Sequence, residues 1–356
     1  MKQPSLKNKL HVALILAIGM ASAPAALAGS KGMAYVSNQD GGVTVIDLET
    51  MEAKGNLDIG AKSPRGIGIS ADGKLLVTAN RDNGNISIID TATGKAIKHV
   101  AIGKNPEFVR IYGDNAYVTY EPSSEAGPPP KPGSEAAKKD DDDDKLPGHI
   151  AIVDLKTGKL VQDITGKPET EGIEFSKDGK KMIVTNESDN SITVHDMKSG
   201  KLLKNIAVAS YGERPRGIKV SPDGKSYVST LELSDKLLVL DNDLKPIKTI
   251  ATGKTPYGVS FDREGKRLFV ASNKEKALQV YDAKTFEKIK DVPTGDRCWH
   301  FTFTPDDAHI LLACGKSNEV VVIDTQKLEV TKRITGMEMP WGIVTYPKSM
   351  GSLDRP

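Results

Sequence analysis

The sequence contains none of the short motifs that mark the common catalytic chemistries. It has no Gly-x-Ser-x-Gly segment, no His-Glu-x-x-His segment, no phosphate-binding loop and no dinucleotide-binding fingerprint. It also lacks Cys-x-x-Cys-His, the motif through which haem is attached covalently. The residues alone therefore give no direct sign of a serine hydrolase, a zinc protease, a nucleotide-binding enzyme or a c-type cytochrome.

The chain also has no excess of charge of either sign and few cysteines. It carries 49 Lys and Arg residues against 47 Asp and Glu residues, with only two cysteines and two tryptophans in 356 residues. Surfaces that bind nucleic acids or anionic membranes have an excess of basic residues. We therefore expect no nucleic-acid partner, no membrane partner for the mature chain, and a monomer.

The first 28 residues have the pattern of a cleavable secretory signal. A basic start is followed by an apolar run from Leu10 to Ala23, which is short for a membrane anchor and is ended by Pro24, and then by Ala26-Leu27-Ala28 as the cleavage site. An uncleaved membrane anchor is the alternative interpretation. We expect residues 1–28 to be removed and the mature chain, residues 29–356, to be periplasmic. Because that compartment is oxidising, Cys298 and Cys314 become candidates for a disulfide.

The stretch from Ser63 to Asp90 contains a pattern that recurs along the mature chain. Alternating β-branched and polar residues, an Asp-Gly turn at 72–73 and a Thr-Gly-Lys turn at 93–95 predict an antiparallel four-stranded meander. Its length of about 43 residues is typical of one propeller blade. The predicted strands are Gly66–Ser70, Leu75–Asn80, Ile86–Asp90 and Ala96–Ile102.

Seven copies of this unit are visible, because an apolar strand that ends in Asp recurs seven times. The last copy has only an innermost strand, from Pro340, and the first copy lacks a strand before Ala34. The two parts complement each other. We therefore predict an all-β fold, a seven-bladed β-propeller whose first blade joins one C-terminal strand to three N-terminal strands (1+3 closure). The recurring residues are Asp47, Asp90, Asp154, Asp196, Asp241, Asp282 and Asp324.

The second strands of these units carry a recognisable motif. Tyr35-Val36-Ser37-Asn38, Leu76-Val77-Thr78-Ala79-Asn80, Tyr117-Val118-Thr119-Tyr120 and Ile183-Val184-Thr185-Asn186, with their flanking Asp-Gly-Lys turns, resemble the YVTN family of β-propeller repeats. The resemblance covers essentially all of the mature chain. It implies the propeller fold, whereas propellers of this kind have many functions.

Two segments indicate which subgroup of this family the chain resembles. Residues 296–303 and 340–347 are similar to the periplasmic YVTN propellers that accompany alcohol catabolism dependent on pyrroloquinoline quinone (PQQ). This implies a non-enzymatic binding or accessory protein beside quinoprotein alcohol oxidation. Its funnel face would bind a small ligand or a periplasmic redox protein, with PQQ as a possible cofactor.

The third blade contains an insertion. The Asp residues of adjacent units are 41 to 45 positions apart, except for a spacing of 64 between Asp90 and Asp154, so about 24 residues are extra. Residues 121–148 are rich in Pro and then in Asp, which predicts a disordered loop over the mouth of the channel. The run Asp140–Asp144 is either a solvated segment or a site for Ca²⁺ or a basic partner.

One residue at the start of each innermost strand is expected to face the central funnel. Four of these residues, on adjacent blades, are charged and three are aromatic, which suits a flat anionic or polar ligand such as a quinone, an aromatic alcohol or aldehyde, or a tetrapyrrole. The alternative is that the tryptophans pack between blades and the charges pair across the ring. The residues are Arg65, Glu107, Glu171, Arg216, Tyr257, Trp299 and Trp341.

The cysteines allow two interpretations. A hairpin centred on the turn at 305–307 places Cys298 opposite Cys314, which predicts a disulfide. Alternatively, His300, Met337 and Met339 converge near them as a copper site or as axial ligands of haem. His195 lies in a third strand, where we expect a structural role.

Three functions therefore stay open. The first is the non-enzymatic binding or accessory role, and the second is a lactonase-like hydrolase, a class that this fold resembles, using Glu107 and Glu171 with Arg65 and Arg216. The third is a carrier of haem or copper through His300, similar to the haem-binding propeller of periplasmic nitrite reductases.

Overall fold

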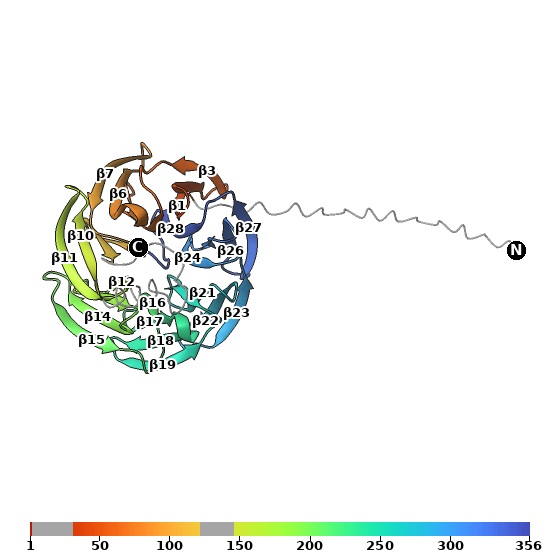
Figure 1. Cartoon of the computed structure of the whole chain (residues 1–356). Helices are drawn as coiled ribbons and strands as arrows, with labels where there is room; N and C mark the ends of the chain where they lie inside the picture. Colours follow the sequence, from red (N-terminus) through yellow and green to blue (C-terminus); the bar gives the residue numbers. More distant parts are fainter. Residues whose placement is uncertain (2–30, 122–145) are drawn as a thin grey trace, which may run out of the picture.

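Seven four-stranded antiparallel sheets surround a central channel (Figure 1). The computed structural model describes Met1, residues 31–121 and residues 146–356. The expected signal segment and most of the expected disordered insertion, including Asp140–Asp144, lie outside the described residues. Besides strands, the described residues contain two short 3-10 helices, η1 (Arg81–Asn83) and η2 (Glu232–Ser234).

Each sheet is one blade, numbered here along the chain from the innermost strand outward. Blade 1 contains β28 (Pro340–Tyr346), β1 (Met33–Asn38), β2 (Val43–Asp47) and β3 (Glu52–Leu57). Blade 2 contains β4 (Pro64–Ile69), β5 (Leu75–Asn80), β6 (Asn85–Asp90) and β7 (Lys95–Ala101). Blade 3 contains β8 (Pro106–Tyr112), β9 (Asn115–Tyr120), β10 (Pro147–Asp154) and β11 (Lys159–Pro168).

The other four blades follow the same order. Blade 4 contains β12 (Thr170–Phe175), β13 (Lys181–Asn186), β14 (Ser191–Asp196) and β15 (Leu202–Ala207). Blade 5 contains β16 (Pro215–Val220), β17 (Ser226–Leu231), β18 (Lys236–Asp241) and β19 (Pro246–Ala251). Blade 6 contains β20 (Pro256–Phe261), β21 (Arg267–Ser272), β22 (Ala277–Asp282) and β23 (Lys288–Pro293). Blade 7 contains β24 (Cys298–Phe303), β25 (His309–Cys314), β26 (Glu319–Asp324) and β27 (Glu329–Thr335).

The two ends of the described chain meet in blade 1. Strand β28 pairs with β1 in antiparallel register, with Ala34 opposite Thr345 and Val36 opposite Ile343. This pairing confirms the predicted all-β, seven-bladed propeller with 1+3 closure. The insertion boundary was wrong by two residues, because Pro147 and Gly148 already belong to β10, where Pro147 pairs with Pro168.

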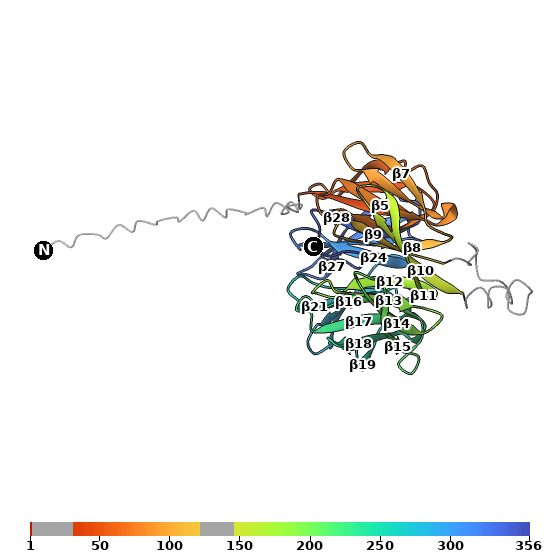
Figure 2. The ribbon, with the colours of Figure 1, turned by 90° about the vertical axis from the view of Figure 1, so that its left-hand side faces the viewer.

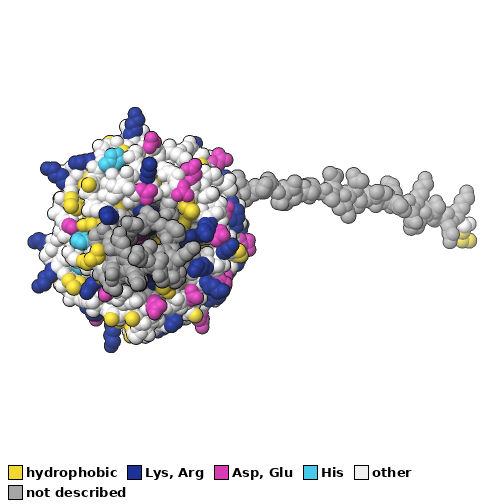
Figure 3. Space-filling view, viewed as in Figure 1, with side chains coloured by type: hydrophobic (Ala, Val, Ile, Leu, Met, Phe, Trp, Pro, Cys, Tyr) yellow, Lys and Arg dark blue, Asp and Glu magenta, His cyan; other side chains and the backbone are white. Residues whose placement is uncertain are grey.

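Burial falls from the channel outward. The inner three strands of a blade are largely buried on both faces, as in β5 and β6, whereas the outermost strand β3 is mostly exposed. The recurring Asp at the end of the third strand fixes the following turn, as where the Asp90 carboxylate accepts a hydrogen bond from the Thr93 amide at 2.7 Å. On the face seen in Figure 3, basic and acidic side chains are interspersed around the rim.

Innermost strands approach each other closely around the channel. A Cβ atom on Gly172 would overlap the Arg216 carbonyl oxygen of the next blade, and one on Gly217 would lie 2.5 Å from the Tyr257 carbonyl oxygen. Glycine at this third strand position therefore allows neighbouring backbones to meet. Blades 3 and 7 carry Phe108 and His300 there instead.

The residues after β28 cross one end of the channel. Gly351 forms a β-bridge with Thr302, and the Ser352 hydroxyl accepts a hydrogen bond from the Phe301 amide at 3.0 Å. Leu353 is almost completely buried. We call residues 349–356 the tail and its side of the ring the lower end; Figure 2 shows the C-terminus at this face. The innermost strands begin at the opposite, upper end.

Cys298 and Cys314 lie directly opposite each other in β24 and β25 and form a disulfide. The bond links residues 16 positions apart in the blade next to the closure. A cross-link of this span stabilises a fold mainly by restricting the unfolded chain.

We predict that replacing both cysteines by serine lowers the free energy of unfolding by about 3 kcal/mol, the value typical of a loop of this length. Urea denaturation of the wild type and the double variant, with and without reductant, measures this loss. The reductant should destabilise only the wild type. A wild type whose thiols are fully reduced and whose stability is unchanged would contradict the prediction.

Candidate functional site

The seven residues predicted to face the funnel lie at the second position of the seven innermost strands, and we call them the upper ring. They are more deeply buried than an open pocket wall would be: 6% of Glu107, 3% of Glu171 and 1% of Trp341 is exposed. The structure therefore shows them as a filled layer across the channel. The members are Arg65, Glu107, Glu171, Arg216, Tyr257, Trp299 and Trp341.

The charged members pair with one another across blades. Arg65 forms an ion pair with Glu107, and its Nε donates a hydrogen bond to Gln39 at 3.0 Å. Arg216 pairs with Glu171 at 3.0 Å. This agrees with the alternative noted from the sequence, in which the charges of the ring pair across it.

Arg216 has the most contacts in this layer. Besides Glu171 it contacts the carboxylates of Glu187 and Glu232, each at 2.7 Å, and it donates to the Tyr257 hydroxyl at 2.6 Å. Its guanidinium also stacks 4.4 Å above the centre of the Tyr257 ring. A guanidinium can donate five hydrogen bonds in one plane, so a single Arg216 orders groups from three blades.

A second set of seven residues, six of them polar, surrounds the upper ring, and the sequence analysis missed it. These residues, the loop ring, come directly after the second strand of each blade. The signal was available, because each follows the last residue of the recurring second-strand motif, but their types differ from blade to blade. The loop ring is Gln39, Arg81, Glu121, Glu187, Glu232, Asn273 and Gly315.

The backbone before each innermost strand fixes the loop ring. The residue preceding the strand has a positive φ in all seven blades, between +45° and +62°. In most blades its carbonyl accepts the amide hydrogen of the loop-ring residue, as Glu169 does from Glu187 at 2.8 Å and Arg214 from Glu232 at 3.0 Å. This strained conformation costs of order 1 kcal/mol for residues other than glycine, and it positions both rings.

The aromatic members fill the other side of the layer. The Trp299 ring lies against Gly315, where a Cβ would overlap it, and the Arg297 guanidinium is 5.3 Å from the centre of that ring. Tyr257 and Trp341 meet edge to face at 6.3 Å. His300 lies beside them, with ring centres 5.2 Å from Tyr257 and 4.3 Å from Trp341.

His300 occupies the middle of the channel. Its Nδ1 is 3.0 Å from the Ser352 hydroxyl, and its Nε2 has no hydrogen-bond partner among the described residues. Burial, with Arg216 and Lys219 nearby, holds the pKa of His300 well below its usual value, so the imidazole is neutral. His195 is buried against the Gly200 carbonyl at 3.1 Å, in keeping with a structural role.

The expected convergence of sulfur and nitrogen ligands is not what the structure shows. Cys298 is in the disulfide, and Met337 is buried in the hydrophobic cluster between blades 1 and 7, apart from the aromatic rings that surround His300. Met339 lies in the strained backbone before β28 and packs, partly buried, against the cluster that contains Tyr257, Trp299 and Trp341. Within the described residues, no three His, Cys, Asp or Glu side chains are arranged to hold a metal ion.

Glu107 and Glu171 form a hydrogen-bonded carboxyl pair with opposite properties. Burial, the nearby Glu107 charge and further carboxylates raise the pKa of Glu171 well above its usual value. The pKa of Glu107 is lowered despite burial, because Arg65, Arg216 and Arg81 stabilise its charge and Glu171 donates to it. Two carboxyl groups so close share one proton, which gives the pair a general acid and a general base.

The fold places the chain among the seven-bladed β-propellers. Two family models match parts of the chain, neither as much as half. Residues 17–107 match the model described as "Cytochrome D1 heme domain". Residues 149–246 match "Lactonase, 7-bladed beta-propeller", a segment that includes Glu171, Glu187, Arg216 and Glu232.

Individual proteins similar to this chain are of the same two kinds as the two family models. The chain is 25% identical over 301 residues to the dihydro-heme d1 dehydrogenase of Pseudomonas aeruginosa; the match covers 73% of this chain and only 60% of that enzyme. The solved structure of the dihydro-heme d1 dehydrogenase NirN in complex with DHE is 18% identical, with a TM-score of 0.64, and the alignment covers 91% of this chain and 77% of NirN. The periplasmic gluconolactonase PpgL of Pseudomonas aeruginosa is 16% identical with a TM-score of 0.68, covering 88% and 98%.

These similarities establish the propeller fold. They also show that the chain is similar to a dihydro-heme d1 dehydrogenase and to lactonases. The link to PQQ-dependent alcohol oxidation expected from the sequence finds no support in these matches. The part of the chain that the structure describes contains no apolar helix of membrane-spanning length.

The shared proton predicts a pH dependence of stability. A carboxyl whose folded pKa is raised stabilises the fold while it is protonated, and this contribution is lost as the pH rises through the raised value. The free energy of unfolding of the wild type should therefore fall as the pH rises from the usual carboxyl pKa of 4.5 to the raised value, by up to about 1.4 kcal/mol for each pH unit crossed. Glu171→Gln should reduce this fall, and Glu187, whose pKa burial raises to about 8, should contribute the remainder.

Glu107→Gln is the matched control for urea denaturation from pH 4 to pH 9. Its lowered pKa gives a contribution that is present above the usual carboxyl pKa and lost in acid, so this variant should change the acid limb instead. Equal slopes above pH 4.5 in the wild type and Glu171→Gln would show that the pKa of Glu171 is not raised.

Proposed function

We propose that the protein is a periplasmic binding protein whose upper end binds a carboxylated tetrapyrrole. The family model of the haem d1 domain and the relative of 25% identity both support a ligand of this class. The periplasmic location rests on the expected signal segment and on likeness to PpgL, a periplasmic protein. The role is binding rather than catalysis, and the partner is a small molecule bound by a monomer.

The observation that carries the proposal is the set of guanidiniums at the upper end. Arg65 and Arg216 lie in the upper ring, Arg81 lies in the loop ring, and Arg214 precedes β16 with 33% of its side chain exposed. Planar guanidiniums bind carboxylates through two parallel hydrogen bonds, which suits the carboxylate substituents of a tetrapyrrole. Arg214 and Arg81 are the two that a ligand arriving from solvent would meet first.

The side chains at the upper end are better suited to bind the carboxylate substituents of a haem than to bind its iron. With Cys298 in a disulfide and Met337 in the interblade core, Met339 and His300 are the remaining candidate ligands from the sequence, and only the ring of His300 is placed beside both Tyr257 and Trp341. His300 is neutral and its Nε2 is unpartnered among the described residues, as an iron ligand requires, yet aromatic rings enclose it. A bound haem would supply a redox-active iron; the arginines would orient it and the aromatic rings would exclude water.

Titration with haemin tests the proposal. We expect a saturable change in the Soret band with one site per chain, and about tenfold weaker binding in Arg81→Gln and Arg214→Gln, because each loses a charge-assisted hydrogen bond. Arg263→Gln is the matched control, since Arg263 lies in the turn after β20 at the lower end and pairs with Asp307. Binding that is absent, or equal in all four proteins, would overturn the proposal.

Lactone hydrolysis is a second candidate, favoured by the Glu107–Glu171 pair. Its members have opposed pKa shifts, and one of the matched family models is a lactonase. In this reaction the ionised carboxyl would accept a proton from the attacking water, and the protonated one would donate to the leaving oxygen. The guanidinium of Arg216, next to Glu171, would stabilise negative charge on the carbonyl oxygen.

A pH-stat assay with glucono-δ-lactone tests this candidate. If it is correct, the wild type exceeds the spontaneous rate and Glu171→Gln loses activity about 100-fold, the usual contribution of a general acid or base. Glu275→Gln, an exposed change between β21 and β22, should have no effect. A wild-type rate equal to the spontaneous rate would exclude lactone hydrolysis and leave the binding proposal unaffected.

A further inference from the structure

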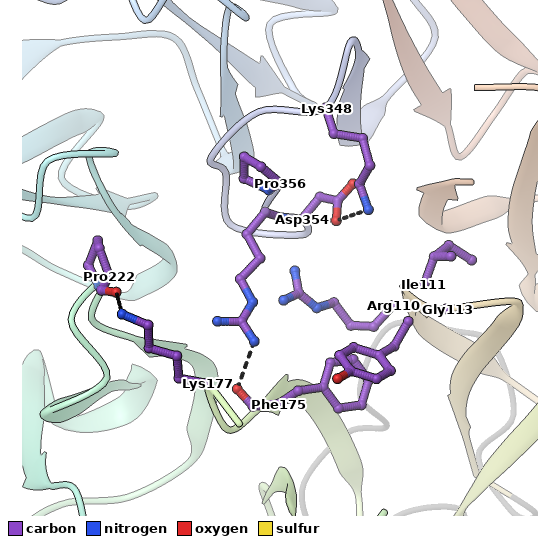
Figure 4. A pocket seen from close by; sticks show the side chains of 11 residues that line it. Arg110, Ile111, Gly113, Phe175, Lys177, Pro222, Lys348, Asp354 and Pro356 are labelled. Carbon is purple, nitrogen blue, oxygen red and sulfur yellow. Dashed lines mark hydrogen bonds and ion pairs between the residues drawn. The ribbon is translucent and has the colours of Figure 1, made fainter. Parts of the chain in front are cut away.

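A cavity of about 420 Å³ opens at the lower end of the channel, away from the upper ring (Figure 4). Arg110 and Tyr112 reach it from β8, Phe175 from the end of β12, and Lys348 and Asp354 from the tail region. Its size is within the range of small-molecule sites. Neither the sequence motifs nor the proposed function accounts for it.

Arg110 is the centre of this cavity. Its side chain is 2% exposed, and in Figure 4 it extends between Phe175 and Asp354. One terminal nitrogen donates to Glu174 at 2.9 Å and the other to the Leu353 carbonyl. Its Nε is buried without a hydrogen-bond partner among the described residues. A buried cationic donor without an acceptor is costly, so this nitrogen favours an acceptor from outside the protein.

The charge around the cavity is positive. Arg110, Lys177, Lys348 and Arg355 line it, whereas Asp354 is the one acidic residue in the lining and Glu174 lies behind it. Glu174 stays ionised, because the surrounding cations lower its pKa to about 2 despite burial. Cationic side chains therefore outnumber acidic side chains around the cavity.

The cationic side chains keep donors for a ligand. Lys177 uses one ammonium hydrogen on the Pro222 carbonyl at 2.7 Å, and Lys348 uses one on Asp354 at 3.0 Å. Because an ammonium group has three donors, each lysine retains two. Arg355 donates to the Phe175 carbonyl at 3.1 Å.

Opposite these charges, the cavity has apolar walls. The rings of Tyr112 and Phe175 contact each other at an angle of 46° with centres 4.8 Å apart, and Ile111, Pro222 and Pro356 also line the cavity. A bare inorganic ion would leave much of 420 Å³ unfilled. A molecule with an anionic head and a flat apolar body matches both the cationic side chains and the walls.

We propose that the lower cavity is a second binding site, which takes a small organic dianion of the phosphomonoester class. Its oxyanion head accepts hydrogen bonds from the free Nε of Arg110 and the ammonium groups of Lys177 and Lys348. Its apolar body lies against Tyr112 and Phe175. The site is separate from the upper ring and independent of the function proposed for it.

Calorimetric titration of the whole chain with phenyl phosphate tests this site. We expect saturable binding with one site per chain, weaker binding of inorganic phosphate because the apolar body is missing, and none of phenol. Lys177→Gln and Lys348→Gln should each weaken phenyl phosphate about tenfold. Lys180→Gln, an exposed change in the turn after β12, is the matched control.

Because the Arg110 side chain is buried, the variant Arg110→Met is prone to misfolding. The test therefore relies on the two lysine variants. Phenyl phosphate that does not bind at millimolar concentration, or that binds equally in the wild type and both lysine variants, would overturn the proposal. Arg81→Gln and Arg214→Gln should leave this affinity unchanged, which keeps the result separate from the haemin titration.

Discussion

The backbone pairing of β28 with β1 is the constraint on which the rest of the structure depends. A chain of antiparallel blades has exposed edges until its last strand joins its first. Only in the closed ring do seven innermost strands face one channel, so that residues at the same strand position form a layer. The pairing also sets where the chain goes afterwards, because the residues following Tyr346 have to cross the lower end.

Both ends of the channel carry buried charged side chains on blades 3 to 5. The partners of these charges differ between the two ends. At the second strand position Glu107, Glu171 and Arg216 pair with each other and with the loop ring. Three positions further along, the corresponding residues of blades 3 to 5 are again charged; there Arg110 pairs with Glu174 at 2.9 Å, and the tail supplies further partners. The Leu353 carbonyl accepts from Arg110 and the Asp354 carbonyl from Lys219 at 3.0 Å. Buried charges need such partners, so the tail is part of the electrostatics of the ring.

The fold was predictable because its signal is repeated seven times, whereas the chemistry of the site is not repeated. Apolar alternation and the recurring Asp give the strands, and the midpoint of one hairpin gives the position of Cys298 opposite Cys314. The second-position residues were found because strand order alone brings them together. Whether they line an open pocket or fill a layer depends on side-chain reach, and here Arg216 reaches Glu187 and Glu232. The tail contacts had no periodic signal, since the tail is present once.

The aromatic layer separates the two ends of the channel. Phe108 and His300 belong to blades on opposite sides of the closure, yet their ring centres are 6.0 Å apart, and Trp341 is 4.3 Å from His300. In these two blades the third position of the innermost strand is not glycine. The larger side chains of Phe108 and His300 therefore fill the axis of the channel. A ligand at the upper end and one at the lower end therefore meet different chemistry with no direct contact. His300 is the residue that touches both regions, because its ring lies against Trp341 and its Nδ1 lies 3.0 Å from Ser352 of the tail.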